Sequence, residues 1–361
     1  MPEVALHASH LALGAKMGPF GGWDMPIEYT AGTVAEHNGV RNAVGIFDVS
    51  HMGKVRILGP GAYEFANSVF ANDIDRIKPG QAQYSMLCNE SGGIIDDLIV
   101  YLVSNEEVRF IPNAGNASTV VAHLEKIVPA NIVIENNHLT QGIIAIQGPK
   151  SAELLQSLEL PTDHEYMAFV DATWNGFAVS ICRTGYTGEH GYELVIENAG
   201  LVPLWDTLLR NGQSLSVLPC GLGARDTLRT EMGYVLHGQD ISPEISPVQA
   251  RTGWAVGWGK PNFAGREALI AEKEAGPSRV AWGLLATGRG IPRSHMQVKN
   301  AAGEVVGETT SGTFSPTLQK GIALALLNPG VAAGDQLIID VRGRDLEVVV
   351  AKPPFVNATT K

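Results

Sequence analysis

The run GGIIDDLIVY, residues 92–101, places two adjacent acids after a pair of glycines and at the start of a strongly β-prone segment. Neighbouring side chains on a strand point to opposite faces, so Asp97, Ile99 and Tyr101 share one face. In a regular strand Asp96 then faces the other way. An acid and a phenol over an aliphatic floor are suited to hold a flat heteroaromatic ligand. Acids that cap a turn or lie in solvent give the same spacing, so both interpretations stay open on this run alone.

A second candidate is the glycine-rich run RTGYTGEHGYEL, residues 183–194. Glycines in a short loop let the backbone approach a ligand closely. Tyr186 and Tyr192 are available for stacking, and Glu193 is an acid entering an apolar strand, where it needs a partner. A glycine-rich hairpin with ordinary surface groups is the competing interpretation.

The third candidate is CGLGARDTLRTEMGY, residues 220–234. Arg225 and Arg229 are four positions apart on an expected helix and so share a face. A guanidinium there is able to bind a carboxylate bidentately. Taken alone, this run favours the simpler arrangement, in which Arg225 pairs with a neighbouring acid.

The familiar cofactor signatures are missing from the sequence. GLGARD, residues 221–226, lacks the third glycine of a dinucleotide fingerprint, and no Walker A, HExxH or GxSxG motif occurs. His7, His10 and His51 do not have a metal-ligand spacing. The three cysteines lie far apart and form no CxxC pair, which argues against a disulfide framework or a zinc site and favours reduced thiols. We therefore expect a site without metal, built from scattered residues.

Composition narrows the class of protein further. The chain has 361 residues and a net charge of −11 without a basic run, which argues against nucleic-acid binding. No apolar stretch approaches the roughly 18 residues of a membrane span. The first residues have no pattern of a secretory signal, so we expect a cytoplasmic location and no membrane partner.

The elements that must position these residues alternate between helices and closely spaced strands. This spacing favours an α+β fold with antiparallel sheets. Helices are expected over residues 33–43, 116–127, 150–158, 201–210 and 222–232, with another opening at Pro60-Gly61. Strands are expected over residues 84–88, 97–103, 108–112, 131–135, 142–147, 177–182 and 192–196. From Arg279 onward the pattern is β only, typical of a small sandwich or barrel, with residues 271–278 as the expected linker.

The combination and order of the motifs resemble one family. The matching segments are PFGGWDMPIEY (19–29), GIFDVSHMG (45–53), QYSMLCNESGGIIDDLIVY (83–101), AIQGP (145–149), RTGYTGEHGYE (183–193), CGLGARDTLR (220–229), GRGIPR (288–293) and TSGTFSPTLQKGIALA (310–325). Together they resemble the glycine cleavage T-protein family over nearly the whole chain.

The resemblance implies a fold and a domain division. The family fold is a three-lobed cloverleaf, in which two α+β lobes and a C-terminal β-barrel-like lobe surround a central folate site. Applied to this chain, it implies a folate-binding region over residues 1–272, made of two interleaved lobes. The barrel domain then spans residues 279–361.

The resemblance also implies an aminomethyltransferase reaction. The one-carbon unit passes from the aminomethyl-dihydrolipoyl arm of lipoylated H-protein to tetrahydrofolate, and ammonia is released. Tetrahydrofolate is thus expected as the acceptor substrate and H-protein as the partner. Arg293 and Lys320 are candidate residues of the docking surface for an acidic H-protein.

Site residues are implied position by position. Asp97 matches the essential aspartate, which would lie beside the folate nitrogens, stabilise positive charge and, secondarily, take a proton. Glu193 would bind the amino edge of the pterin, and Arg225 would face the acidic tail or stabilise the pocket. The folate-binding residues implied by the matching motifs are Met52, Tyr84, Tyr101, Asn113, Tyr186, Glu193 and Arg225.

Two other functions compete with this one. One is a tetrahydrofolate-dependent demethylase of a methylated sulfur or nitrogen compound, and the other is a non-catalytic folate-binding maintenance protein. Asp97, the TGYTGE loop and a complete C-terminal lobe favour the transferase. The sequence departs from the family pattern at His190, in IPNAGN (111–116) and in LHGQDI (236–241), which bears on fine specificity.

Overall fold

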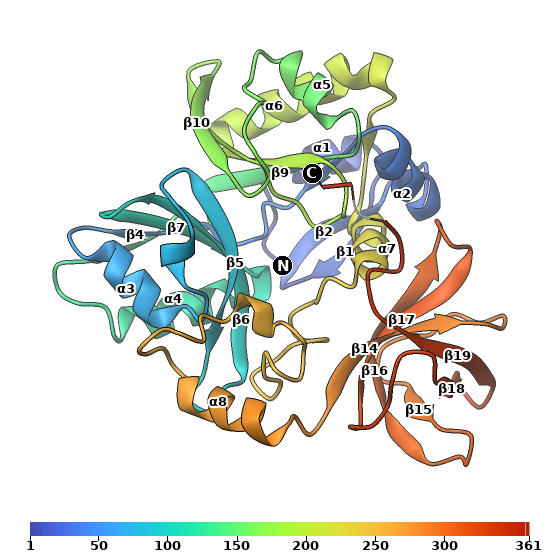
Figure 1. The fold of residues 1–361 in the computed structure, drawn as a ribbon. Helices are drawn as coiled ribbons and strands as arrows, with labels where there is room; N and C mark the ends of the chain where they lie inside the picture. Colours follow the sequence, from blue (N-terminus) through green and yellow to red (C-terminus); the bar gives the residue numbers. More distant parts are fainter. Residues whose placement is uncertain (358, 361) are drawn as a thin grey trace.

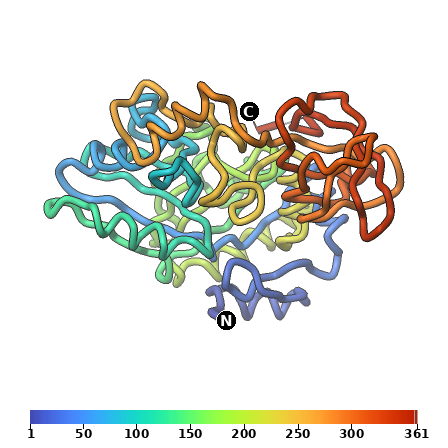
Figure 2. The backbone as a smooth tube through the Cα atoms, turned by 90° about the horizontal axis from the view of Figure 1, so that it is seen from below, coloured from blue at the N-terminus to red at the C-terminus, as the bar shows by residue number. Residues whose placement is uncertain are grey.

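The computed structural model describes residues 1–357 and 359–360. Three groups of strands surround a central region that holds helix α7, Leu222–Met232 (Figure 1). Seen from below, the closed barrel occupies one end of the molecule, and the N-terminal segment runs along one face (Figure 2). Neighbouring strands in these sheets are mostly antiparallel, which confirms the expected α+β fold.

The first lobe is a five-stranded sheet in the order β5-β6-β7-β4-β8. Its strands are β4 (Val55–Leu58), β5 (Gln81–Cys88), β6 (Ile94–Ser104), β7 (Glu107–Pro112) and β8 (Val133–Asn136). Helices α3 (Ala62–Val69) and α4 (Ala117–Glu125) accompany the sheet, with the short helical turns η1 (Ile74–Arg76) and η2 (Ala114–Asn116). A buried cluster that includes Phe70, Val100 and Phe110 fills the space between helices and sheet. The opposite face of β6 therefore points toward the centre of the molecule.

The second lobe is a six-stranded sheet in the order β10-β11-β12-β9-β3-β13. Its strands are β3 (Gly45–Asp48), β9 (Gln141–Gln147), β10 (Phe169–Trp174), β11 (Phe177–Cys182), β12 (Gly191–Glu197) and β13 (Leu218–Pro219). Helices α5 (Ser151–Gln156) and α6 (Asn198–Asn211) cover its outer face (Figure 1), followed by the turn η3 (Gly212–Leu215). Trp205 is fully buried between α6 and the sheet. The chain thus passes from lobe two (β3) to lobe one (β4–β8) and back (β9), so the lobes are interleaved.

The third lobe is a closed barrel in the order β14-β17-β16-β15-β18-β19. Its strands are β14 (Val280–Ala286), β15 (Gln297–Lys299), β16 (Val305–Ser315), β17 (Lys320–Leu327), β18 (Gln336–Asp340) and β19 (Asp345–Ala351). Closure leaves no long unpaired edge. The barrel confirms the all-β character expected from Arg279 onward.

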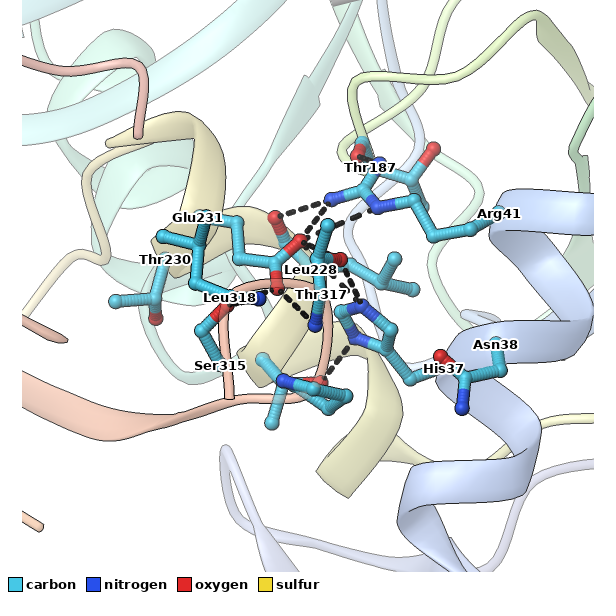
Figure 3. A network of polar contacts seen from close by, with 12 residues as sticks. His37, Asn38, Arg41, Thr187, Leu228, Thr230, Glu231, Ser315, Thr317 and Leu318 are labelled. Carbon is cyan, nitrogen blue, oxygen red and sulfur yellow. Dashed lines mark hydrogen bonds and ion pairs between the residues drawn. The ribbon is translucent and has the colours of Figure 1, made fainter. Parts of the chain in front are cut away.

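The N-terminal segment consists of α1 (His7–Ala12), the hairpin β1 (Lys16–Phe20) and β2 (Trp23–Glu28), and α2 (Thr33–Asn42). Helix α2 packs against α7, and a polar network joins both helices to the barrel (Figure 3). Arg41 of α2 donates to Glu231 of α7, which also accepts from Ser315 and Thr317 of the barrel lobe. The network fixes the barrel relative to the centre.

Residues after the barrel return to the second lobe, where the C-terminal label of Figure 1 lies. The Phe355 amide donates to the Glu231 carbonyl at 2.8 Å, and the Thr359 amide donates to the Gly188 carbonyl at 2.8 Å. Arg183 donates to the Thr360 carbonyl at 2.7 Å. This returning segment, residues 353–357 and 359–360, straps the glycine-rich loop 183–191.

The prediction of a linker over residues 271–278 is wrong for most of that segment. Residues 266–275 form helix α8 (Arg266–Ala275), which follows the turn η4 (Gly253–Ala255). The segment REALIAEKEA is rich in strong helix formers, and its Leu269 is fully buried against the Gly92 turn. Only the residues after Gly276 are left to connect α8 to the barrel. The hairpin β1-β2, strand β10 and helix α1 were not expected from the sequence.

Candidate active site

A cavity of about 770 Å³ lies where the three lobes meet. It is bordered by β5 and β6 of the first lobe, by the glycine-rich loop and β12 of the second, and by β14, β16 and β17 of the barrel. All eight residues singled out from the sequence border it: Met52, Tyr84, Asp97, Tyr101, Asn113, Tyr186, Glu193 and Arg225. The structure therefore brings together side chains that are up to 173 positions apart in the sequence, from Met52 to Arg225.

Asp97 is held on β6 by two neighbours. The Tyr84 hydroxyl donates to one carboxylate oxygen at 3.0 Å, and Asn113 Nδ2 donates to the other at 2.7 Å. Burial raises the pKa of Asp97, while these donors and nearby His237 act in the opposite direction. Ile99 and Tyr101 line the same cavity, as expected from the alternation of side chains along a strand.

Asp96 lies outside the cavity lining, on the other side of the strand. It is fully buried and accepts hydrogen bonds from the backbone N–H of Asn113 at 3.0 Å and from the side-chain Nδ2 of Asn113 at 2.9 Å. Burial and the charge of Asp97 raise the pKa of Asp96. The Nδ2 of Asn113, a residue expected to bind folate, thus orients the two acids.

The turn before β6 depends on a glycine. A Cβ at Gly93 would lie 1.8 Å from the Pro243 carbonyl oxygen, so a side chain there has no room. The Ile94 amide donates to the Ser242 carbonyl at 3.0 Å in the same contact. This close approach fixes where β6 begins and hence which face Asp97 occupies.

Met52 borders the cavity from the loop between β3 and β4. Lys54 holds that loop, since its ammonium donates to the Ser50 and Met52 carbonyls, both at 2.8 Å. Burial lowers the pKa of Lys54 to about 7. The neighbouring His51 also borders the cavity, and burial lowers its pKa to about 3, so its imidazole is neutral.

Glu193 and Arg225 occupy another part of the cavity wall. The Thr184 hydroxyl donates to Glu193 at 2.5 Å. The guanidinium of Arg225 lies 4.8 Å from the centre of the Tyr186 ring, and its buried Nη1 has no hydrogen-bond partner among the described residues. Burial lowers the pKa of Arg225, and the nearby charge of Glu193 opposes that shift.

Two interpretations of the motifs taken alone are wrong. Arg225 does not pair with an acid, because Asp226 instead forms an ion pair with Arg229 at 2.7 Å. Tyr192 is unavailable for stacking on a ligand, because it is fully buried in the core of the second lobe. His190 also lies outside the cavity lining, where it hydrogen-bonds Ser151 at 2.9 Å.

Sequence reasoning missed an aromatic rim. Trp254 stacks on Tyr84 with a centroid separation of 5.4 Å and is 68% exposed, which places it at the cavity mouth. Arg251 and Trp282 border the same cavity. The tryptophan-rich run TGWAVGWGK, residues 252–260, was the available signal, since exposed tryptophans are enriched at binding sites.

The described residues contain no group of three or more His, Cys, Asp or Glu side chains placed to hold a metal ion. Over the same residues, no helix is long and apolar enough to cross a membrane.

Comparisons with known proteins agree over the length of the chain. Residues 6–260 match the GCVT N-terminal domain, and residues 279–357 match the glycine cleavage T-protein C-terminal barrel domain. An aminomethyltransferase from Frankia alni is 57% identical over 357 residues, covering 99% of this chain and 98% of the relative. The chain belongs to the glycine cleavage T-protein family.

Other T-protein relatives give the same result. An aminomethyltransferase from Mycobacterium tuberculosis is 53% identical over 368 residues, covering 100% of this chain and 99% of the relative. The crystal structure of glycine cleavage system aminomethyltransferase T from Bartonella henselae matches with a TM-score of 0.94 at 34% identity, covering 99% of each chain. The chain is therefore an enzyme of the aminomethyltransferase class, and the demethylase and the non-catalytic folate binder are not supported.

Proposed function

We propose that this chain binds tetrahydrofolate in the central cavity and transfers to it the one-carbon unit carried by aminomethylated H-protein. The observation that carries the proposal is Asp97, which is oriented by Tyr84 and Asn113 and faces a largely apolar cavity. The volume of about 770 Å³ lies within the range of roughly 300–1,000 Å³ that is usual for small-molecule sites.

Asp97 supplies the electrostatic contribution. As a carboxylate it accepts an N–H of the folate and stabilises the positive charge that develops as ammonia leaves the transferred carbon. It also takes the proton released when the folate nitrogen bonds to that carbon. The low polarity of the surroundings strengthens both effects, because few water dipoles compete with the carboxylate.

Glu193 and Arg225 are proposed to recognise the pterin end. A carboxylate accepts two parallel N–H bonds, as the amino edge of a pterin offers. The unpartnered Nη1 of Arg225 and its proximity to Glu193 support a role in holding that carboxylate and the ring beside it. Of the two roles expected for Arg225, stabilising the pocket is favoured over facing the acidic tail.

H-protein is proposed to dock near the barrel lobe, in the cytoplasm. Arg293 is exposed and borders a second cavity of about 270 Å³ that shares Asp226 with the central one. Lys320 is exposed at the start of β17. Docking there gives an acidic partner positive charge to meet. We also propose residues 1–272 and 279–361 as the two domains.

A coupled assay tests the proposal. Purified enzyme, aminomethyl-lipoylated H-protein and tetrahydrofolate should yield methylenetetrahydrofolate and ammonia in equal amounts, and omission of any one component should remove the product. Folate binding without turnover would refute the transfer reaction for this chain.

A further inference from the structure

The glycine-rich loop 183–191 borders the cavity but has no ladder of its own to fix its shape. Tyr186 lines the cavity there, and Thr184 donates to Glu193 at 2.5 Å. Among the described residues, no backbone hydrogen bond joins one member of the segment 184–189 to another. Because buried backbone groups need partners, the shape of the loop must come from groups outside it.

Arg41 supplies such a group from helix α2. Its Nη1 donates to the Thr187 carbonyl at 2.7 Å and to Glu189 Oε1 at 2.8 Å. Its Nη2 donates to Glu231 of α7 at 2.7 Å (Figure 3). One guanidinium thus spans the loop and the central helix, which the planar fork of an arginine allows and the single ammonium of a lysine does not.

Glu189, the acid of the TGE triplet in this loop, is bound through both of its carboxylate oxygens. Oε1 accepts from Arg41, and Oε2 accepts from the Thr359 hydroxyl of the returning segment. The side chain of Glu189 is 7% exposed and that of Arg41 is 10% exposed, so water screens their attraction little. The carboxylate therefore ties the loop to α2 and to the returning segment.

A short chain of contacts connects this attachment to the cavity wall. The Thr187 hydroxyl donates to Gln147 Oε1 at 2.7 Å, and Gln147 Nε2 donates to the Thr184 carbonyl at 3.2 Å. A Cβ at Gly185 would lie 2.1 Å from Gln147 Oε1, so the backbone between them has little room to move. A displacement of Thr187 is therefore passed to Thr184, which holds Glu193.

We infer that Arg41 is a positioning residue for folate binding, which acts through the Thr187 carbonyl and through Glu189. These contacts hold loop 183–191 in the shape that supports Glu193 at the cavity. Arg41 itself lies outside the cavity lining and touches no reacting atom. The inference rests on the proposed folate site and deepens it.

The two sides of the guanidinium separate positioning from a purely structural role. Glu189→Gln keeps the size of the side chain but weakens the contact that holds the loop. Glu231→Gln is the matched control, because it changes the other acidic partner of the same arginine and leaves the loop contacts in place. Arg41→Met removes both contacts, and Arg41→Lys keeps the charge without the fork.

Steady-state assays with aminomethylated H-protein give the KM for tetrahydrofolate. Glu189→Gln should raise this KM about three- to fivefold, because a charge-assisted hydrogen bond becomes a neutral one, while kcat and the KM for H-protein stay at parental values. Arg41→Met should have a larger effect in the same direction, and Arg41→Lys should recover part of it. If Arg41→Met does not fold, Glu189→Gln and Arg41→Lys still decide the question.

Hydrogen exchange without ligand gives a second readout that does not depend on folate. The amides of residues 184–189 should exchange faster in Glu189→Gln than in the parent, with the sheets unaffected. Glu231→Gln should lower the thermal midpoint but leave both the KM for tetrahydrofolate and the protection of these amides unchanged.

Three outcomes overturn the inference. If Glu189→Gln keeps the parental KM for tetrahydrofolate, Arg41 has only a structural role. If Glu231→Gln raises that KM as much as Glu189→Gln does, the effect comes from a general loosening of the fold. If the parent itself does not bind tetrahydrofolate in calorimetry, the folate site falls and this inference falls with it.

Discussion

Two buried carboxylates of this enzyme, Glu231 and Asp97, differ in the partners that surround them. Glu231 accepts bonds from Arg41 at 2.7 Å, from Ser315 at 2.5 Å and from Thr317 at 2.9 Å (Figure 3). Burial alone would raise the pKa of Glu231, but the neighbouring His37 and, after it, Ser315 and Arg41 lower it to about 2. Asp97 has only two neutral donors and no cationic partner within 4 Å among the described residues. Burial raises its pKa.

The difference separates a structural charge from a reactive one. A buried carboxylate with several partners is satisfied, and the pairing fixes the elements that supply those partners. A buried carboxylate without a cationic partner is able to interact strongly with a positively charged ligand. Groups with such shifted pKa values cluster at functional sites. Glu231 therefore links α7 to α2 and the barrel lobe. Asp97 is left able to stabilise the positive charge that develops in the proposed reaction.

The strongest test of this contrast is Asp97→Asn. The amide keeps the shape but cannot stabilise positive charge, so kcat should fall by about 10²–10⁴, the usual contribution of such a group. Folate affinity should change little, and the thermal midpoint should stay the same or rise. Steady-state ammonia release measures the effect, with Asp171→Asn, an acid outside the cavity, as control. Near-normal turnover would remove Asp97 from the chemistry.

Glu231→Ala should act on stability instead. Removing the carboxylate leaves the barrel hydroxyls without this acceptor and leaves Arg41 with Glu189 as its remaining acidic partner. Breaking such a buried pair costs about 3–5 kcal/mol. Urea unfolding measures the loss, and the folded fraction should keep its kcat. Glu135→Gln, at a surface pair with Arg56, is the control and should cost less than about 1 kcal/mol. A large fall in kcat without loss of stability would contradict the structural role.

The carboxylate of Glu231 also makes the stability of the fold depend on pH in the acidic range. The folded-state pKa of Glu231, about 2, lies below the ordinary value of 4.5. The stabilisation is therefore complete above pH 4.5 and is lost as the pH falls toward 2. In Glu231→Gln this part of the pH dependence should be absent. Unfolding free energies measured from pH 6 downward should give a shallower slope for the variant, and parallel curves would argue against the assignment.

Asn113→Ala should shift the pH profile of the reaction. Its amide favours the charged form of Asp97, so its removal raises the pKa of Asp97 and reduces the ionised fraction at a given pH. We expect kcat/KM to fall about tenfold near neutrality, since a hydrogen bond to a charged group contributes about 1.5–3 kcal/mol. Part of the activity should return at higher pH. Asn198→Ala, remote from the cavity, should leave the profile unchanged, and an unshifted profile in Asn113→Ala would refute the orienting role.

An effect of similar size, confined to ligand binding, is expected for Glu193→Gln. Exchanging one acceptor for a donor at the pterin edge should weaken folate affinity about tenfold, with little change in stability. Calorimetry with tetrahydrofolate monoglutamate measures it. Glu197→Gln, on the same strand but exposed, is the matched control. Equal affinities for the two variants would place the pterin elsewhere.

The sequence predicted features that depend on local periodicity. The alternation along β6 correctly predicted that Asp97 and Tyr101 share one face, and both border the cavity. The composition of residues 279 onward correctly indicated an all-β lobe. Family resemblance added Met52, Tyr84 and Asn113, while the aromatic rim at Trp254 was missed. The role of Glu231 was not foreseeable, since its barrel partners lie 84 and 86 positions away. Likewise, that Asn113 serves the acids and that Arg225 lacks an acid partner follow only from packing between distant segments.

The returning segment has a consequence for the order of assembly. It joins loop 183–191 to residues about 170 positions later, beyond the barrel. Contacts of such long sequence separation form late, because a large loop must close first. On the ribosome, moreover, the barrel is made before this segment and well after β12. The loop beside Glu193 thus acquires its final support only when the chain beyond the barrel has emerged. During synthesis, the lobes are therefore expected to fold before the substrate site is complete.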